Sequence, residues 1–371
     1  MKALSNLQQL LADEAPLIDV RAPVEFAQGA FPSAVNLPIL DDEERHRVGL
    51  CYREEGPEAA TRLGHQFVAG QVKQSRIQAW IDFIEKHPNA RLYCFRGGQR
   101  SGIACQWLSE AGYRIDRVEG GYKALRRSLL AVYEQLPPLL VVSGRTGSGK
   151  TLFLKNFSQV VDLEGTANHR GSAFGGYLNG QPSQVDFENR VAIRFLQLAG
   201  NSPVLIEDEG RLIGRIHVPL PLQEAMRRSP LLVIEDDVAT RGQRILDEYI
   251  VEQSASYEAR YGDAGYDQFA AYLLAAADAI RKRLGNVAHQ EVREAMIRAL
   301  DEQHRTGDPG LHLAWINRLL TEYYDPMYDY QLKSKSSRIL VSGTHEEVLD
   351  WVTSHLESGC LDGNGGSPCE S

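Results

Sequence analysis

The sequence predicts an α/β protein of two domains, each built on a parallel sheet. The chain has 371 residues, enough for two domains. Two segments have the form apolar strand, glycine-rich loop, helix: one carries Cys94 in its loop and the other carries Lys150. Strands that alternate with helices in this way form parallel sheets covered by helices. The pair Pro137-Pro138 lies between the two segments and marks a boundary.

We therefore expect a first domain at 1–136 and a second at 137–358. The second domain contains a helical region at about 222–335. The segment 359–371 is polar and rich in glycine, which predicts a disordered tail. Cysteines in that tail, Cys360 and Cys369, are poor candidates for catalysis.

Composition excludes several classes of protein. The net charge of -9 argues against a non-specific polyanion binder. Five irregularly spaced cysteines do not form a disulfide framework or a zinc site. No apolar run approaches the roughly 18 residues that span a bilayer, and the N-terminus lacks an apolar signal core. We expect a cytoplasmic protein with no membrane contact.

The first domain begins with a short helix at 4–11 and a buried strand at 16–21. Asp19 and Arg21 alternate along this strand, so they share one face and are placed to brace nearby loops. A charged, helix-forming insert follows at 41–75, and its acidic start suits a helix N-terminus. Cys51 in this insert is expected to be a packing residue, although its role stays open.

Cys94 follows the apolar run 91–93 and precedes a helix that starts near Ile103. Backbone N–H groups of the loop and the positive end of the helix converge on such a thiol and acidify it. Arginines add bidentate donors for an oxyanion. The predicted catalytic residue is Cys94, and the predicted oxyanion loop is Phe95, Arg96, Gly97, Gly98, Gln99, Arg100 and Ser101. Cys105, in the following helix, either packs or resolves a persulfide.

The pattern D-V-R-x-P-x-E-F…G…P-x-A-x-N-x-P, followed by a strand that ends in cysteine, resembles the rhodanese domain. The resemblance spans about 12–135 and implies that Cys94 carries a persulfide or its selenium analogue. Single-domain rhodaneses commonly read C-x-x-G-x-R-S, whereas here Arg100 lies six residues after Cys94. The longer loop suits a tetrahedral oxyanion, and the rhodanese-like dual-specificity phosphatases also use C-x5-R. Those phosphatases place His before the cysteine, and this chain places Tyr93 there.

The second domain opens with a strand at 139–143 that is apolar throughout, as for a strand buried on both faces. It leads into G-x-x-x-x-G-K-T and then a helix, the context that this phosphate-binding motif requires. The backbone N–H groups wrap a phosphate, Lys150 reaches the outer phosphates, and Thr151 can hold Mg²⁺. The predicted phosphate-binding residues are Gly144, Arg145, Thr146, Gly147, Ser148, Gly149, Lys150 and Thr151.

Further strands with acidic ends are expected at 160–164, 203–209, 231–237 and 338–342, which gives a P-loop NTPase-like parallel sheet. The strand at 203–209 is the one most like a Walker B strand. Its carboxylates Glu207 and Asp208 are candidates to orient a metal ion or a water molecule. The polar loop at 163–176 contributes His169 and Arg170 as candidate ligand contacts. The helical region combines arginines with tyrosines such as Tyr249 and Tyr257, which is compatible either with single-stranded RNA or with an ordinary solvated face.

The order D-V-R…C-F-R-G-G-Q-R-S, then G-R-T-G-S-G-K-T, then L-E-G-x-A-N-H-R-G-S-x-F-G resembles the tRNA 2-selenouridine synthase family along nearly the whole chain. The resemblance implies an enzyme that replaces the sulfur of wobble 2-thiouridine in tRNA with selenium. It implies selenophosphate as donor, geranyl diphosphate as a second substrate, and a selenophosphate-supplying enzyme as a partner. No tightly bound cofactor is expected, and Mg²⁺ is compatible with the P-loop.

Three rival functions stay open on the residues alone. A sulfurtransferase needs only Cys94 and leaves the P-loop unexplained. A phosphatase uses Cys94 and Arg100. A regulatory or RNA-binding NTPase module needs no chemistry at Cys94.

Overall fold

The computed structural model describes residues 4–198, 200 and 203–357. The chain divides into two compact units, and each is described by itself. The cysteine unit spans 1–135 and 183–199, and the P-loop unit spans 136–182 and 200–371. The predicted parallel α/β architecture is confirmed in both. The first break lies one residue before the predicted boundary. The larger difference is that 183–199 groups with the first unit. The predicted tail at 359–371 lies outside the described residues.

The cysteine unit is built on a parallel sheet whose strands lie in the order β2-β1-β3-β4. Its core packs apolar side chains of the sheet, such as Ile18 and Leu92, against Trp80 and Trp107 of the covering helices. The strands are β1 (Leu17–Asp19), β2 (Ala34–Asn36), β3 (Arg91–Tyr93) and β4 (Asp116–Arg117). The helices are α1 (Asn6–Ala12), α2 (Pro23–Ala27), α3 (Asp42–Glu55), α4 (Pro57–Phe67), α5 (Gly70–Lys86), α6 (Gln99–Glu110) and α7 (Gly121–Leu130), followed by the 3₁₀ turn η1 (Ala131–Glu134).

The predicted helical insert is confirmed as α3, α4 and the start of α5. Asp41 caps α3: its carboxylate accepts a hydrogen bond from the N–H of Glu44, and the Glu44 carboxylate accepts one from the N–H of Asp41. This reciprocal cap satisfies two backbone donors that the first turn of a helix leaves free.

Helix α10 (Gln184–Gln197) joins the cysteine unit although it follows the P-loop in sequence. It packs against α1 and α7. The Asp186 carboxylate accepts from the N–H of Ala30 at 2.8 Å, and the buried Asn189 amide donates to the Ala30 carbonyl at 2.7 Å. Arg126 of α7 donates to the Asn189 side-chain oxygen at 2.7 Å. The helix therefore satisfies the N–H and the carbonyl of Ala30 and covers the face of the unit formed by α1 and α7.

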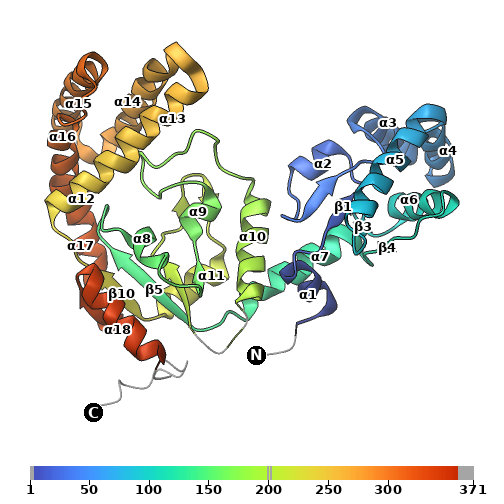
Figure 1. Cartoon of the computed structure of the whole chain (residues 1–371), viewed down its shortest axis with the longest axis horizontal. Helices are drawn as coiled ribbons and strands as arrows, with labels where there is room; N and C mark the ends of the chain where they lie inside the picture. Colours follow the sequence, from blue (N-terminus) through green and yellow to red (C-terminus); the bar gives the residue numbers. More distant parts are fainter. Residues whose placement is uncertain (1–3, 199, 201–202, 358–371) are drawn as a thin grey trace. The chain divides into compact units, whose positions relative to one another are not determined.

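The P-loop unit is built on a parallel sheet of order β11-β10-β5-β7-β6. Figure 1 labels β5 and β10 of this sheet. The four further strands predicted from the sequence are all present. The strands are β5 (Leu139–Gly144), β6 (Val160–Val161), β7 (Val204–Glu207), β10 (Leu231–Ile234) and β11 (Ile339–Gly343), with the antiparallel pair β8 (Leu212–Ile213) and β9 (Ile216–His217) set apart. Short helices near the sheet are α8 (Lys150–Leu154), α9 (Leu163–Ala167), α11 (Leu220–Arg228) and α18 (His345–Glu357).

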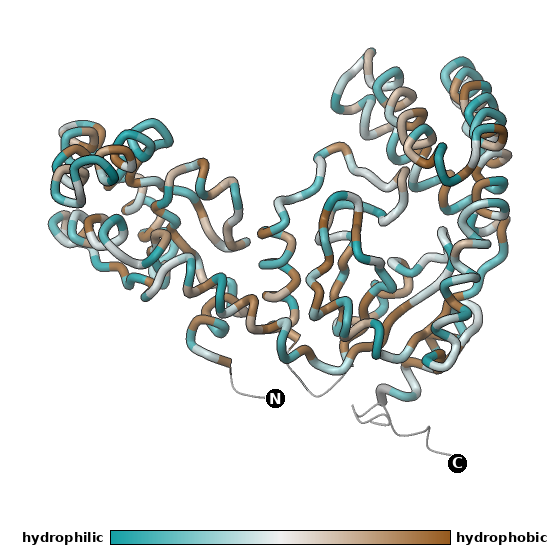
Figure 2. The backbone as a smooth tube through the Cα atoms, turned by 180° about the vertical axis from the view of Figure 1, so that it is seen from behind, coloured by the Kyte–Doolittle hydropathy of each residue, from teal (hydrophilic) through white to brown (hydrophobic). Residues whose placement is uncertain are grey.

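A bundle of helices between β10 and β11 has a core of its own. Figure 2 shows hydrophilic and hydrophobic segments alternating along these helices, as amphipathic helices do. Tyr249 and Tyr257 are buried in that core, so neither ring is available to stack on an RNA base. The helices are α12 (Val238–Ile245), α13 (Glu252–Tyr261), α14 (Gly265–Leu284), α15 (Asn286–Thr306), α16 (His312–Leu319) and α17 (Asp325–Lys333), with π-helical turns η2 (Leu246–Val251) and η4 (Leu320–Tyr324). Among the described residues, no helix combines the length and the apolar character needed to cross a membrane.

Candidate active site

Cys94 lies directly after β3, at the start of the loop that leads into α6. Its Sγ is 3.1 Å from the Ser101 hydroxyl oxygen, and the residue is only 3% exposed. Burial alone raises the pKa of the thiol. Hydrogen bonds from the Ser101 side chain and from the N–H groups of Ser101 and Arg96 outweigh burial, with help from the charge of Arg100, so the pKa of Cys94 is lowered. The thiolate is the nucleophilic form, so this site favours nucleophilic chemistry.

The loop around Cys94 is held against the start of α7. The N–H of Tyr122 donates to the Cys94 carbonyl at 2.9 Å, and the N–H of Lys123 donates to the Phe95 carbonyl at 3.1 Å. Gly121 has φ of +57°, and a Cβ there would lie 2.2 Å from the Cys94 carbonyl oxygen. Only glycine fits this contact, which explains the Gly120-Gly121 pair in the sequence.

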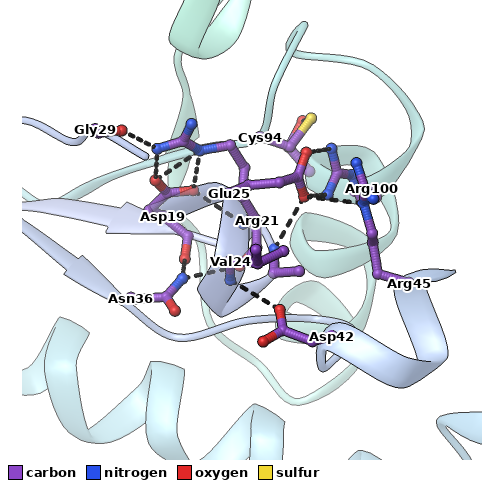
Figure 3. Close-up of polar contacts among 12 residues, drawn as sticks. Asp19, Arg21, Val24, Glu25, Gly29, Asn36, Asp42, Arg45, Cys94 and Arg100 are labelled. Atoms are coloured by element: carbon purple, nitrogen blue, oxygen red, sulfur yellow. Dashed lines mark hydrogen bonds and ion pairs between the residues drawn. The ribbon is translucent and has the colours of Figure 1, made fainter. Parts of the chain in front are cut away.

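The two predicted oxyanion donors differ in the structure. Arg100 is bound to Glu25 of α2 through both of its terminal nitrogens, one of them 3.1 Å from Glu25 Oε1 (Figure 3). Burial raises the pKa of Glu25, but the Arg100 guanidinium outweighs that effect and the pKa is lowered. Arg96 is exposed, and no ion pair of its side chain occurs among the described residues. Sequence reasoning missed Glu25, although it belongs to the motif that carries the resemblance.

Asp19 and Arg21 form a buried pair that braces the neighbouring loop, as their alternation predicts. Arg21 Nη2 lies 2.6 Å from Asp19 Oδ2 and also donates to the Gly29 carbonyl at 2.9 Å (Figure 3). The guanidinium stacks on the ring of Tyr122, 3.9 Å from its centroid. Tyr122 directly follows Gly121, so this pair also supports the Cys94 loop.

An open cleft of about 760 Å³ adjoins the Cys94 loop within the cysteine unit. Its wall includes Phe95 and Arg100 of the loop, and Glu25 is an acidic member. The basic side chains on the wall are Arg21, Arg45, His46, Arg53 and Arg100. This excess of positive groups suits an anionic ligand near the thiol.

The remaining loop residues and cysteines have structural partners. Phe95 stacks on Tyr122, and Gln99 donates to the Thr61 hydroxyl at 2.6 Å. Burial is the main cause that raises the pKa of Cys105 and also that of Cys51. Of the three cysteines in the described part of the chain, Cys94 is the one whose environment favours the thiolate.

The P-loop lies between β5 and α8 with its lysine folded back on the strand. Lys150 Nζ donates to the Gly144 carbonyl at 3.3 Å, and the N–H of Ser148 donates to the Arg145 carbonyl at 3.0 Å. Gly147 has φ of +81°, which allows the loop to turn its N–H groups inward. Ser148 is buried, and its hydroxyl has no hydrogen-bond partner in the described residues. This arrangement suits phosphate oxygens.

Two arginines that sequence reasoning missed support this loop from α12. Arg241 is fully buried, donates to the Thr146 carbonyl at 3.2 Å and forms a bidentate pair with Asp325. Arg244 donates to the Gly147 carbonyl and to Asp236. They lie about a hundred residues after the motif, so no local pattern identifies them.

Glu207 ends β7 beside the P-loop and Asp208 directly follows it, but the two have different partners. Glu207 accepts from the Thr151 hydroxyl at 3.3 Å and from the N–H groups of Leu163 and Glu164. Asp208 accepts from Lys335 at 2.7 Å and from the Ser143 hydroxyl. Across the described residues there is no group of three or more His, Cys, Asp or Glu side chains placed to hold a metal ion.

Buried carboxyl groups gather near Lys150. Burial and mutual repulsion raise the pKa values of Glu164, Glu207 and Glu209, while the Lys150 charge opposes the shift. Their protonated forms therefore persist to higher pH than usual. A neutral carboxyl does not repel a phosphate, so this shift favours anion binding at the P-loop.

The loop at 168–176 fixes His169 and Arg170 in separate environments. His169 Nδ1 accepts from the N–H of Gly171 at 3.1 Å, and burial lowers the pKa of its imidazole. The Arg170 guanidinium lies over the rings of both Tyr177 and Tyr249, 4.2 and 4.9 Å from their centroids. Arg170 also lines an open cleft of about 540 Å³ within the P-loop unit.

The fold and the two loops define a class of protein: a rhodanese-like unit joined to a P-loop unit. Family models agree, since the rhodanese-like domain matches residues 3–128 and the tRNA 2-selenouridine synthase AAA domain matches residues 137–359. The tRNA 2-selenouridine synthase of Shewanella sediminis is 46% identical over 361 residues, which cover 96% of this chain and 98% of that protein. Those of Marinobacter nauticus and Pseudomonas fluorescens are 49% and 48% identical, and each match covers 94% of this chain and 97% of the relative. The chain belongs to the tRNA 2-selenouridine synthase family.

Proposed function

We propose that this chain replaces the sulfur of wobble 2-thiouridine in tRNA with selenium from selenophosphate. The route runs through S-geranylation by geranyl diphosphate and a selenylated Cys94. The observation that carries the proposal is the buried thiol with a lowered pKa beside a cationic cleft. Membership of the family and the presence of a P-loop in the same chain support it.

Geranylation is assigned to the P-loop unit. The thiocarbonyl sulfur attacks C1 of geranyl diphosphate, an S–C bond forms, and the C–O bond breaks with its electron pair on diphosphate. The uracil N3–H proton is lost to solvent, so the ring stays neutral. Lys150 and the loop N–H groups stabilise the charge that develops on the leaving diphosphate. The product carries a thioether, which makes the sulfur a leaving group.

Selenation is assigned to Cys94. Its thiolate attacks selenium, the S–Se bond forms and the Se–P bond breaks with its electron pair on phosphorus, so phosphite leaves. The terminal selenium then attacks C2 of the uracil and geranylthiol departs. A low-molecular-weight thiol cleaves the remaining S–Se bond, giving 2-selenouridine and a disulfide.

Metal and partner requirements belong to the same proposal. The Thr151 hydroxyl and the Glu207 carboxyl group are oxygen donors at the P-loop, and Mg²⁺ held by them against the diphosphate would favour the ionised form of Glu207. The ion would neutralise charge on the leaving group. A selenophosphate-supplying enzyme is the expected partner, and no step consumes ATP.

The test uses the full-length protein, thiolated tRNA, geranyl diphosphate, selenophosphate and a thiol, with digested nucleosides analysed by mass spectrometry. Wild type should make 2-selenouridine. Cys94→Ser should stop at the geranylated thionucleoside, and Lys150→Ala should fail to geranylate. Unimpaired geranylation by Lys150→Ala would overturn the assignment of that step to the P-loop.

Phosphorus NMR of the same reaction decides the fate of selenium. Phosphite identifies selenium transfer to Cys94. Phosphate together with a phosphorylated Cys94 shows that the thiolate attacks phosphorus and overturns the selenylated cysteine. Transfer of sulfur from thiosulfate to cyanide with no change in tRNA would favour the sulfurtransferase.

A further inference from the structure

The open cleft of about 540 Å³ in the P-loop unit lies between the loop at 168–179 and α13. Its volume falls in the range of small-molecule pockets, about 300–1,000 Å³. The wall carries little net charge, since its charged side chains are Arg170, Arg260 and Glu252. The wall also has three amides and an aromatic ring: Asn168, Asn179, Gln253 and Tyr177. Such a wall suits a neutral, flat, polar ligand better than a phosphate group.

Two polar atoms of this wall lack partners, although most of its polar groups are satisfied. Asn168 and Asn179 both form hydrogen bonds within the unit. Gln253 is only 5% exposed and donates to the Gly176 carbonyl at 2.8 Å, yet its Oε1 accepts no hydrogen bond from the described residues. Arg170 Nη1 is buried and also lacks a partner there. Because unpaired buried polar atoms are costly, a ligand that offers one donor and one acceptor would stabilise the site.

Tyr177 offers a ring face on which a flat ligand can stack. The residue is 40% exposed, whereas Tyr249 and Tyr257 of the neighbouring bundle are buried. The Arg170 guanidinium lies 4.2 Å from the centroid of the Tyr177 ring, which fixes one side of that ring. Exposed aromatic side chains of this kind stack on unpaired bases of RNA.

The loop that carries Arg170 also reaches the P-loop. Gly171 follows Arg170 with φ of +70°, and a Cβ there would lie 3.3 Å from both carboxyl oxygens of Glu209. Burial raises the pKa of Glu209, and Lys150 is close enough to oppose the shift. The cleft and the phosphate-binding loop are therefore neighbours within one unit. Reaction between a bound base and a bound diphosphate requires this proximity.

We propose that this cleft binds the unstacked wobble base of tRNA, a 2-thiouracil, while its sulfur is alkylated at the P-loop. The inference rests on the proposed function and adds the residues that recognise the base. The imide edge of the base presents a donor, N3–H, beside an acceptor, O4. In this pose N3–H donates to Gln253 Oε1, Arg170 Nη1 donates to O4, and the ring stacks on Tyr177. The sulfur at C2 lies on the other side of N3 and stays free to attack.

Photocrosslinking of the wild-type protein gives the first test. A tRNA with 5-iodouridine at the wobble position keeps the imide edge and has no sulfur to alkylate, so it stays unaltered beside geranyl diphosphate. After irradiation, peptide mass spectrometry should place the crosslink on Tyr177 or within 252–260. Crosslinks confined to other segments, such as 45–53 of the cysteine unit, would overturn the proposal. No substituted protein is needed, so folding defects do not affect the result.

The kinetics of geranylation give the second test. Tyr177→Ala removes the stacking surface and should raise the KM for thiolated tRNA at least about tenfold, with the KM for geranyl diphosphate unchanged. Tyr177→Phe retains the ring and should behave as wild type. The matched control is Tyr330→Ala, which removes a 79% exposed tyrosine outside the cleft and should change neither KM. A wild-type KM for tRNA in Tyr177→Ala would contradict the stacking.

Binding of anticodon stem-loops tests recognition of the imide edge. A stem-loop with N3-methyl-2-thiouridine at the wobble position lacks the donor, so wild type should bind it at least about tenfold more weakly than one with 2-thiouridine. Gln253→Ala no longer offers Oε1 and should reduce this difference. Equal binding of the two stem-loops by wild type would show that the site does not read this edge.

The two proposals fail in different ways. If Lys150→Ala geranylates thiolated tRNA as wild type does, the P-loop assignment in the proposed function is wrong. If Lys150→Ala fails to geranylate while Tyr177→Ala keeps the wild-type KM for tRNA, only the base site is wrong.

Discussion

The pKa of the Cys94 thiol is lowered although the residue is buried, and burial by itself would raise it. A thiol shielded from water favours its neutral form, yet Ser101 and the loop N–H groups donate to the sulfur and reverse this. Arg100 adds charge while remaining bound to Glu25, which fixes its orientation. The sulfur is therefore an acidified nucleophile whose neighbours are already in place.

Substitution of Ser101 tests this balance. Ser101→Ala removes a donor to the thiolate, so the pKa of Cys94 should rise and less thiolate should be present at pH 7. The rate of alkylation by iodoacetamide at pH 7 should fall roughly tenfold and recover at higher pH. Ser75→Ala, which removes an exposed hydroxyl that bonds to the Val72 carbonyl, is the control. An unchanged pH profile in Ser101→Ala would show that the hydroxyl does not stabilise the thiolate.

At the scale of elements, the junction between β3 and α7 positions the reactive loop. Gly121 begins α7 with a left-handed φ and lies against the Cys94 carbonyl. The helix can start there only because no side chain separates the two backbones. The geometry of the loop thus depends on an element that comes twenty-seven residues later.

Two glycine substitutions distinguish the cost of a positive φ from the cost of a steric clash with the Cys94 carbonyl. Gly112→Ala and Gly121→Ala both place alanine at positive φ, at a cost of about 1 kcal/mol each. A methyl group at Gly112 would meet nothing within 4 Å, whereas one at Gly121 would lie 2.2 Å from the Cys94 carbonyl oxygen. Gly121→Ala should therefore lower the free energy of unfolding by at least about 2 kcal/mol more. Urea unfolding followed by tryptophan fluorescence measures this, and equal losses would contradict the contact.

The range over which residues interact decided what could be predicted from the sequence. Both reactive loops are encoded within ten consecutive residues, and their strand-to-helix context could be predicted from local patterns. The pairing of Arg100 with Glu25 spans 75 residues, and the support of the P-loop by Arg241 spans 95. Such pairs depend on the path of the whole chain. For the same reason, burial of Tyr249 and Tyr257 in the bundle could not be told from an exposed aromatic face.

At the scale of the whole molecule, the cysteine unit is discontinuous in sequence. Its described residues fall within 1–135 and 183–199, and α10 supplies Asp186 and Asn189 to Ala30. The matched family models do not follow this division, since the second model covers α10. A folding unit and a sequence-defined domain therefore have different boundaries in this chain.

Fragments of the cysteine unit test this discontinuity. A fragment of residues 1–135 lacks α10 and should be less stable by at least about 3 kcal/mol, because buried residues such as Phe187 and Val191 no longer cover it. Fusion of residues 183–199 through a glycine-rich linker should restore stability and the reactivity of Cys94. Asn189→Ala in the fused segment should restore less. A fragment 1–135 as stable as the fusion would show that α10 is dispensable.

The path of the chain through α10 also determines how the protein responds to cleavage. The backbone passes from one unit to the other after 135, after 182 and after 199. A single nick after Gln135 would produce a piece that lacks α10, while α10 stays covalently attached to the other piece. The packing of that helix would still join the two pieces, as the halves of a split enzyme are joined. We therefore expect the two polypeptides produced by this cleavage to remain associated through α10.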